Sequence, residues 1–172
     1  MDFIADLKSN IPDFAKDIRL NLDSVILRSS INQDDATACA LAAAFASGSK
    51  KIVDSILTSG KLSKTQSDAA LTAASLMAMN NIYYPFVEMA TDPELKGQKP
   101  ELRMNAYATY GGVDKRQFEM YALSASIVGK CHFCVQSHYA LLRKEGLTSV
   151  QLRDIGRIAA VISAAARIVE IR

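Results

Sequence analysis

The chain has 172 residues, of which 49% are apolar and 22% charged, so it can bury one hydrophobic core without disulfide or metal staples. Its net charge is only +2 and its Lys and Arg residues are dispersed, which gives no support for nucleic-acid binding. The longest apolar stretches, 38–46 and 158–166, are about half the length that a membrane span needs, and residues 1–6 lack a signal-peptide core. We expect a soluble, cytoplasmic protein, since three cysteines with two in a close pair fit a reducing compartment.

Helix-forming residues dominate the sequence, and no alternating strand pattern with hairpin turns is present, so we predict an all-α fold. The predicted helices cover residues 13–28, 34–47, 50–59, 64–79, 81–90, 115–128, 131–145, 148–154 and 156–170. Between the fifth and the sixth of them, prolines and the pair Gly111-Gly112 predict a loop-rich segment over 91–112.

The segments on either side of this loop resemble each other. Residues 41–46 stand 82 positions before residues 123–128, and both Ser63 and Thr148 can open an alanine-rich helix with a capping box. We interpret 1–172 as a single compact helical domain with a degenerate internal repeat, its first half at about 13–90 and its catalytic half at about 113–172. Chance similarity between alanine-rich helices is the alternative.

The second half carries Cys131, Cys134 and His138, preceded by Glu119. Two cysteines three positions apart share a helix face and can close into a disulfide, and a histidine four positions later lies one turn further along that face. Glu119 falls at a core-facing position, where a carboxylate is costly unless paired, and His138 is the available partner. These groups together are what a thiol redox site needs.

The two thiols are predicted to differ in chemistry. Gly129-Lys130 indicates a break between helices, which places Cys131 in the first turn of the next helix, where the helix dipole and Lys130 stabilise a thiolate. Cys134 lies one turn inward and has His138 as its proton partner. At the 82-residue offset, the first half has Thr37, Ser49, Ile52 and Ile56 in place of Glu119, Cys131, Cys134 and His138.

Other readings of these residues stay open. The two cysteines can be inert buried thiols, or they can bind zinc with His138 and Glu119, although three ligands along one helix fit tetrahedral geometry poorly. His132 is predicted to point away from the cysteine face. We interpret Cys39 as a small core residue, and the methionines at 77, 79 and 89 as side chains that fill the core rather than as metal ligands.

Glu119, Cys131-x-x-Cys134 and His138 at this spacing resemble the motif of the alkyl hydroperoxidase D family, within the carboxymuconolactone-decarboxylase-like superfamily. The similarity extends to residues 103–105, 111–115, 141–143 and 146, and it covers nearly the whole chain. The resemblance implies an all-helical homotrimer with alkyl hydroperoxidase activity.

The resemblance also implies a role for each motif residue. Cys134 would be oxidised to a sulfenic acid, Cys131 would be the proton donor that closes the disulfide with Cys134, and Glu119 with His138 would form a proton relay. No bound cofactor or metal is expected. The electron donor would be the dihydrolipoyl group of a 2-oxo acid dehydrogenase component, and the protein would reduce the peroxiredoxin alkyl hydroperoxide reductase C.

One position departs from the pattern, because some family members have a histidine where this chain has Phe133. His132, one place earlier, cannot simply replace it. A general thiol–disulfide oxidoreductase with little peroxidase activity is therefore the main alternative. A non-catalytic or metal-binding helical scaffold is a second, and a lactone decarboxylase is a third, although that branch generally lacks the cysteine pair.

Overall fold

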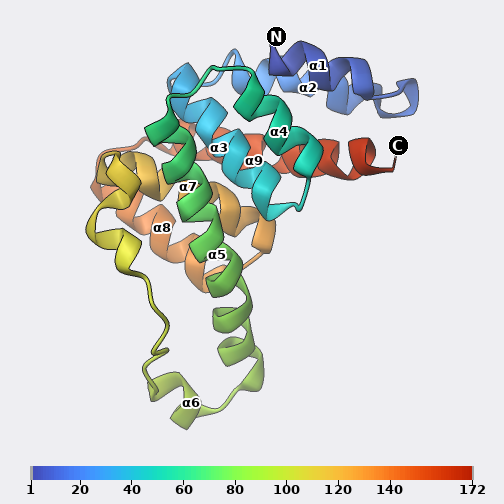
Figure 1. Cartoon of the computed structure of the whole chain (residues 1–172). Helices are drawn as coiled ribbons and strands as arrows, with labels where there is room; N and C mark the ends of the chain where they lie inside the picture. Colours follow the sequence, from blue (N-terminus) through green and yellow to red (C-terminus); the bar gives the residue numbers. More distant parts are fainter. Residues whose placement is uncertain (1, 172) are drawn as a thin grey trace.

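The computed structural model describes residues 2–171, and within that range the regular structure is entirely helical, which confirms the predicted fold class (Figure 1). The α-helices are α1 (Phe3–Asn10), α2 (Lys16–Ile26), α3 (Gln33–Ala46), α4 (Lys50–Thr58), α5 (Lys64–Ala90), α6 (Pro93–Gly97), α7 (Lys115–Gly129), α8 (His132–Lys144) and α9 (Ser149–Glu170). Three short 3₁₀ helices complete the set: η1 (Asp13–Ala15), η2 (Asn105–Ala108) and η3 (Tyr110–Gly112).

Two pairs of predicted helices are continuous in the structure. The predicted helices 64–79 and 81–90 form α5, and the predicted helices 148–154 and 156–170 form α9. The first gap falls at Asn80, where the side chains of Asn80 and Asn81 are buried and Asn81 donates to the carbonyl of Ala125 on α7, 3.2 Å away. These contacts between helices outweigh the weak helix propensity of asparagine.

Two helices were not predicted. In α1, the carboxylate of Asp2 accepts from the N–H of Ile4 and caps a short helix that buries Phe3, Ile4 and Leu7. In the middle segment, α6 begins with Pro93 directly after the N-cap Asp92. The predicted helix 13–28 is divided into η1 and α2.

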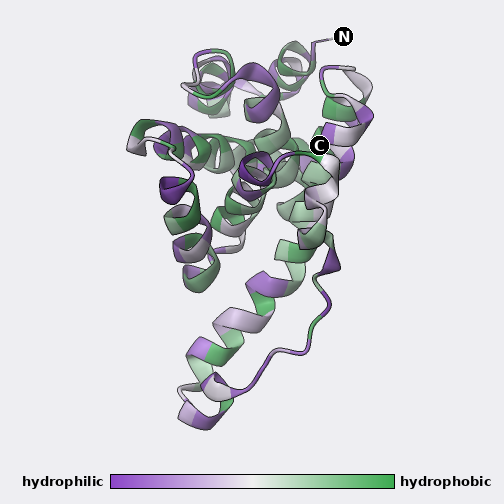
Figure 2. Cartoon of the chain, turned by 90° about the vertical axis from the view of Figure 1, so that its left-hand side faces the viewer, coloured by the Kyte–Doolittle hydropathy of each residue, from purple (hydrophilic) through white to green (hydrophobic). Residues whose placement is uncertain are grey.

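The core is built around α3, α5 and α7, which pack against one another, while α9 crosses α2, α3 and α7 (Figure 1). Figure 2 shows that hydrophilic and hydrophobic residues are interspersed along the helices. Most of α3 is buried, and its alanines let the neighbouring backbones approach closely. Cys39 on this helix is fully buried and free, as its reading as a core residue predicted. Burial and the nearby Asp35 raise the pKa of its thiol, so Cys39 remains protonated.

The same order of caps and helices occurs in both halves. Asn32 caps α3 and Asp114 caps α7, Ser49 caps α4 and Cys131 caps α8, and Ser63 and Thr148 cap α5 and α9 with capping boxes. The first two pairs stand 82 positions apart in the sequence. The origin of this pattern by duplication stays a prediction.

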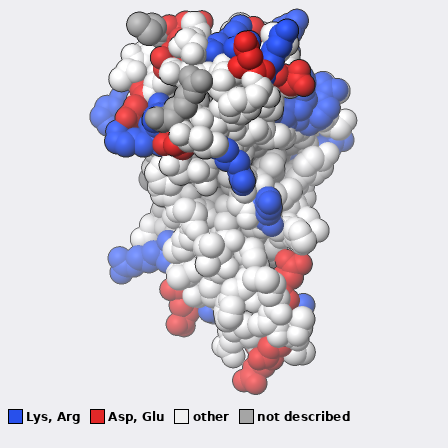
Figure 3. Space-filling model, turned by 90° about the vertical axis from the view of Figure 1, so that its right-hand side faces the viewer, with Lys and Arg blue, Asp and Glu red and all other residues white. Residues whose placement is uncertain are grey.

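The last turns of α5 and the short α6 project away from the bundle, and an extended segment without regular structure leads back from α6 to the bundle (Figure 1). Three large apolar side chains on this part of α5 are exposed: Ile82, Phe86 and Met89. Figure 3 shows positive and negative side chains intermingled at the end that holds the termini, without a continuous basic surface on that face. Among the described residues, no helix combines the length and the apolar character that crossing a bilayer requires.

Candidate active site

A tight turn between α7 and α8 places the cysteine pair. Gly129 ends α7, and Lys130 adopts the left-handed conformation, with φ of 56°. The N–H of Cys131 then bonds to the carbonyl of Ser126, 3.4 Å away. The helix break predicted at Gly129-Lys130 is confirmed, and it delivers Cys131 to the start of α8.

Cys131 and Cys134 form a disulfide, with their Cα atoms 5.3 Å apart. Cys131 is the N-cap residue of α8 rather than a member of its first turn, so the predicted helix start is one residue early. Its Sγ accepts from the backbone N–H of Cys134 at 3.2 Å. After reduction, this N–H and the helix dipole would favour a thiolate at Cys131.

The second part of the site is a buried pair of Glu119 and His138. Glu119 comes from the middle of α7 and His138 from α8, and Oε2 of the carboxylate lies 2.5 Å from Nδ1 of the ring. Both side chains are almost completely buried, at 3% and 8% exposure of their residues. The contact fixes Nδ1 as the nitrogen that faces the carboxylate. The opposite nitrogen, Nε2, lies 3.2 Å from Sδ of Met77 on α5.

A cavity of about 320 Å³ joins the two parts of the site. Its walls come from α5, α7, α8 and the segment before α7, and they are largely apolar or aromatic: Asn80, Tyr84, Met104, Tyr107, Glu119, Phe133, Cys134, Ser137, His138 and Leu141. Cys134 lines this cavity and Cys131 does not. A small molecule that enters it therefore lies next to both Cys134 and His138.

Aromatic residues form one wall of the cavity. The rings of Phe133 and Tyr84 stack with their centroids 4.4 Å apart, and the pair also borders a larger hollow of about 550 Å³. His132 lies in that second hollow, where its Nδ1 is 3.1 Å from Oε1 of Glu88. His132 thus points away from the cysteine face, as its position on the helix predicted.

Several residues of the site, the cavity walls and the partner of His138 included, had no signal in the sequence. Met77, Asn80 and Tyr84 lie on α5, and Tyr107 lies in η2, so only the tertiary fold brings them to the motif. Met77 was interpreted as core filler; its side chain is buried in the core, and it also contacts His138. Burial and the negative charge of Glu119 raise the pKa of Tyr107 far above its usual range, so its phenol stays protonated.

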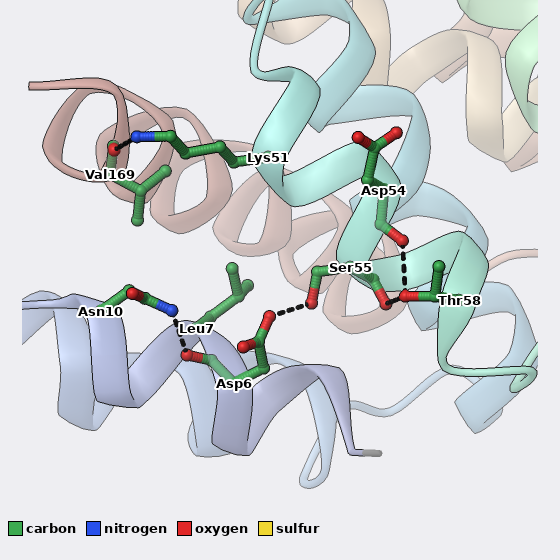
Figure 4. A pocket seen from close by; sticks show the side chains of 8 residues that line it. All are labelled: Asp6, Leu7, Asn10, Lys51, Asp54, Ser55, Thr58 and Val169. Carbon is green, nitrogen blue, oxygen red and sulfur yellow. Dashed lines mark hydrogen bonds between the residues drawn. The ribbon is translucent and has the colours of Figure 1, made fainter. Parts of the chain in front are cut away.

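A separate pocket lies beside α4, the helix that Ser49 caps, with a volume of about 460 Å³ (Figure 4). Polar side chains line it, and the hydroxyl of Ser55 donates to the carboxylate of Asp6. No cysteine or histidine is among its lining residues. Between residues 2 and 171, the structure holds no group of three or more His, Cys, Asp or Glu side chains arranged to bind a metal ion.

Fold and site together define a class: an all-helical protein with a Cys-x-x-Cys disulfide next to a buried glutamate–histidine pair. The family model described as "Carboxymuconolactone decarboxylase family" matches residues 93–171. The chain is 38% identical to alkyl hydroperoxide reductase AhpD of Bradyrhizobium sp. (strain BTAi1 / ATCC BAA-1182), over 97% of this chain and 93% of that protein.

Two further relatives agree. The protein of the same name from Coxiella burnetii (strain RSA 493 / Nine Mile phase I) is 36% identical over 94% of this chain and 93% of its own length. The protein of the same name from Brucella canis (strain ATCC 23365 / NCTC 10854 / RM-666) is 38% identical over 95% of this chain and 94% of its own length. The chain belongs to the alkyl hydroperoxide reductase AhpD family, which confirms the resemblance inferred from the sequence.

Proposed function

We propose that this protein is an alkyl hydroperoxide reductase that works through a Cys131–Cys134 disulfide cycle. The observation that carries the proposal is that Cys134 and the His138–Glu119 pair line one cavity. A cavity of about 320 Å³ with aromatic and aliphatic walls suits the organic group of a small hydroperoxide. The names of the relatives support the same reaction.

In the oxidative half of the cycle, the Cys134 sulfur attacks the outer oxygen of the hydroperoxide. The O–O bond breaks, an alcohol leaves, and Cys134 becomes a sulfenic acid. His138 accepts the thiol proton, Glu119 stabilises the imidazolium that forms, and the ring returns the proton to the leaving alkoxide. The Cys131 thiol then attacks the sulfenic sulfur, which releases water and forms the disulfide.

In the reductive half, a dihydrolipoyl group of a 2-oxo acid dehydrogenase component reduces the disulfide and becomes a lipoyl disulfide. The reduced protein in turn reduces the peroxiredoxin alkyl hydroperoxide reductase C. Cys131 is fully buried and Cys134 is 3% exposed, so a dithiol can reach Cys131 only if the residues that cover it move. These assignments to donor and partner rest on the family alone.

We also propose that the protein acts in the cytoplasm as a homotrimer. The projecting part of α5 supports association, because Ile82 and Met89 are 74% and 75% exposed and Phe86 is 52% exposed. Light scattering tests the oligomeric state: a monomeric mass in solution would overturn this part of the proposal.

Two measurements test the enzymatic proposal. Free thiols should rise by two per chain when the oxidised protein is treated with dihydrolipoamide. The reduced protein should then consume one equivalent of tert-butyl hydroperoxide and lose the same two thiols. If dihydrolipoamide leaves the disulfide intact, the proposed donor is wrong.

A general thiol–disulfide oxidoreductase is the second candidate, and Phe133 favours it, because some family members have a histidine there. The Phe133 side chain is half exposed and stacked on Tyr84, so it supplies no acid or base to the cavity. A comparison of turnover on hydroperoxide with turnover on a disulfide substrate, both with dihydrolipoamide as donor, separates the two candidates. Disulfide reduction without peroxide turnover would select the second.

A further inference from the structure

His138 has a contact that the proposed proton relay does not use. Its Nδ1 faces Glu119 at 2.5 Å, and its Nε2 faces Sδ of Met77 at 3.2 Å. Met77 lies on α5 and is fully buried. Two different helices therefore supply one partner each to the two ring nitrogens.

The thioether of Met77 determines whether Nε2 of His138 carries a proton. A methionine sulfur accepts a hydrogen bond weakly and has no proton to donate, so a hydrogen bond at this contact requires a proton on Nε2. The carboxylate at Nδ1 holds or shares a second proton. With both protons in place, the pair of Glu119 and His138 is neutral overall, which is the arrangement that burial favours.

We propose that Met77 is a positioning residue that keeps a proton on Nε2 of His138 while Cys134 is part of the disulfide. This inference deepens the proposed function and rests on it for its catalytic meaning. A disulfide sulfur carries no charge and is a poor acceptor, so the ring N–H needs another partner in the oxidised protein. After reduction, Cys134 can replace Met77 as the partner that shares a proton with Nε2, since Cys134 and His138 are one turn apart and line the same cavity.

The proton on Nε2 of His138 can be transferred to the Cys134 sulfur when the disulfide is reduced. A donor thiolate attacks the sulfur of Cys131, the S–S bond breaks, and the sulfur of Cys134 leaves with the electron pair and receives the Nε2 proton. The second donor thiolate then displaces Cys131 and closes the donor disulfide. Of the two protons that the dithiol brought, one protonates Cys131 and the other leaves to solvent, so Nε2 is free to accept the thiol proton of Cys134 in the oxidative half of the cycle.

Few other groups near the ring compete for this proton. The titratable side chains that line the cavity besides Glu119 and His138 are Cys134, Tyr84 and Tyr107. Cys134 is in the disulfide, and burial with the charge of Glu119 raises the pKa of Tyr107, which keeps its phenol neutral. Glu119 and Met77 are the side chains within hydrogen-bond distance of the two ring nitrogens, so they set the protonation of the ring in the oxidised protein.

Nuclear magnetic resonance of protein labelled with ¹⁵N-histidine tests this assignment without peroxide or a lipoyl donor. The chain has only two histidines, so a His132→Gln variant assigns the signals of His138. In the oxidised protein at neutral pH, we expect Nε2 to carry a proton. In a Met77→Leu variant, the pH at which Nε2 loses that proton should fall by about one unit, a tenfold change that corresponds to one net hydrogen bond.

The controls separate a lost acceptor from a disturbed core. Met77→Gln supplies an amide oxygen and should restore the wild-type midpoint, whereas Met120→Leu makes the leucine change at a buried methionine beside Asn32 and Leu147 and should leave it unchanged. In reduced protein, Met77→Leu should match wild type. A bare Nε2 in oxidised wild type, or equal midpoints in Met77→Leu and wild type, would overturn the proposal. Absence of peroxide turnover would remove the proposed function and leave this result standing.

Discussion

The side chain of Asn81 fills the space beside Gly129, where its Nδ2 lies 2.0 Å from the position that a Cβ would occupy. The same Nδ2 donates to the carbonyl of Ala125, 3.2 Å away, which ties α5 to α7. Gly129 is the last residue of α7 and directly precedes the turn that leads to Cys131. The contact between α5 and α7 at this level therefore depends on the absence of a side chain at 129.

We expect Gly129→Ala to lower the free energy of unfolding by about 1–3 kcal/mol, because the new methyl group overpacks a buried contact. Urea unfolding of the oxidised protein measures the change. Gly156→Ala is the matched control: nothing lies within 4 Å of its Cβ position and the residue is inside α9, so alanine should stabilise by about 0.5–1 kcal/mol. A loss of stability in both variants would contradict the role assigned to Asn81.

The two cysteines should behave differently when each is replaced by serine. Cys134→Ser should abolish peroxide turnover, because the sulfur that lines the cavity is gone. Cys131→Ser should leave a sulfenic acid on Cys134, since no second thiol remains to close the disulfide. Mass spectrometry after one equivalent of hydroperoxide reads the result. A stable sulfenic acid on Cys131 in the Cys134→Ser variant would reverse the two roles. Cys39→Ser is the control and should behave as wild type, because that thiol is buried and is not part of the disulfide.

The motif was predictable because its spacing is local. Cys131, Cys134 and His138 lie within about two turns from the N-cap of α8, and a core-facing glutamate on the preceding helix needs a partner, which His138 offers. Sequence reasoning therefore proposed the pairing of Glu119 and His138 that the structure contains. The proton-transfer roles of these residues stay predictions.

The cavity and part of the helix boundaries were not predictable, for one shared reason. Met77 and Asn80 reach the site only because α5 continues through Asn80 and Asn81 against α7, and that continuity depends on contacts between residues far apart in the chain. Local propensity favoured a break there. The helix α1 was missed because its first turn relies on Asp2 as a cap and on burial against the rest of the fold.

We expect Glu119→Gln to lower peroxide turnover about 10²–10⁴-fold, the range that loss of a general acid–base group produces. The amide oxygen can still accept from Nδ1 of His138, so the ring keeps its orientation, but the negative charge that stabilises an imidazolium is lost. Turnover with dihydrolipoamide as donor measures the effect, and circular dichroism checks the fold. Glu88→Gln removes the carboxylate beside the exposed His132 and should leave turnover unchanged. Equal turnover in the two variants would remove Glu119 from the relay.

Asp154 should make the stability of the fold depend on pH under acidic conditions. Burial opposes its ionisation, but the N–H of Ser30 and the guanidinium groups of Arg153 and Arg157 bond to its carboxylate and hold its pKa well below the usual range. Its contribution is complete above the unfolded-state pKa of about 3.9. It is lost as the pH falls from there toward the lower pKa of the folded state, because the unfolded chain binds the proton first.

Asp154→Asn should therefore cost about 1–3 kcal/mol of unfolding free energy at pH 7, because two arginines and a backbone N–H lose a charged acceptor inside the fold. It should also flatten the fall of stability below about pH 4, since the titrating group is gone. Denaturant unfolding at a series of pH values measures both effects. Asp13→Asn is the control, because the side chain of Asp13 is 92% exposed in its ion pair with Arg19 and such surface pairs contribute little. If the two variants show the same pH dependence, the buried cluster around Asp154 does not contribute to acid stability.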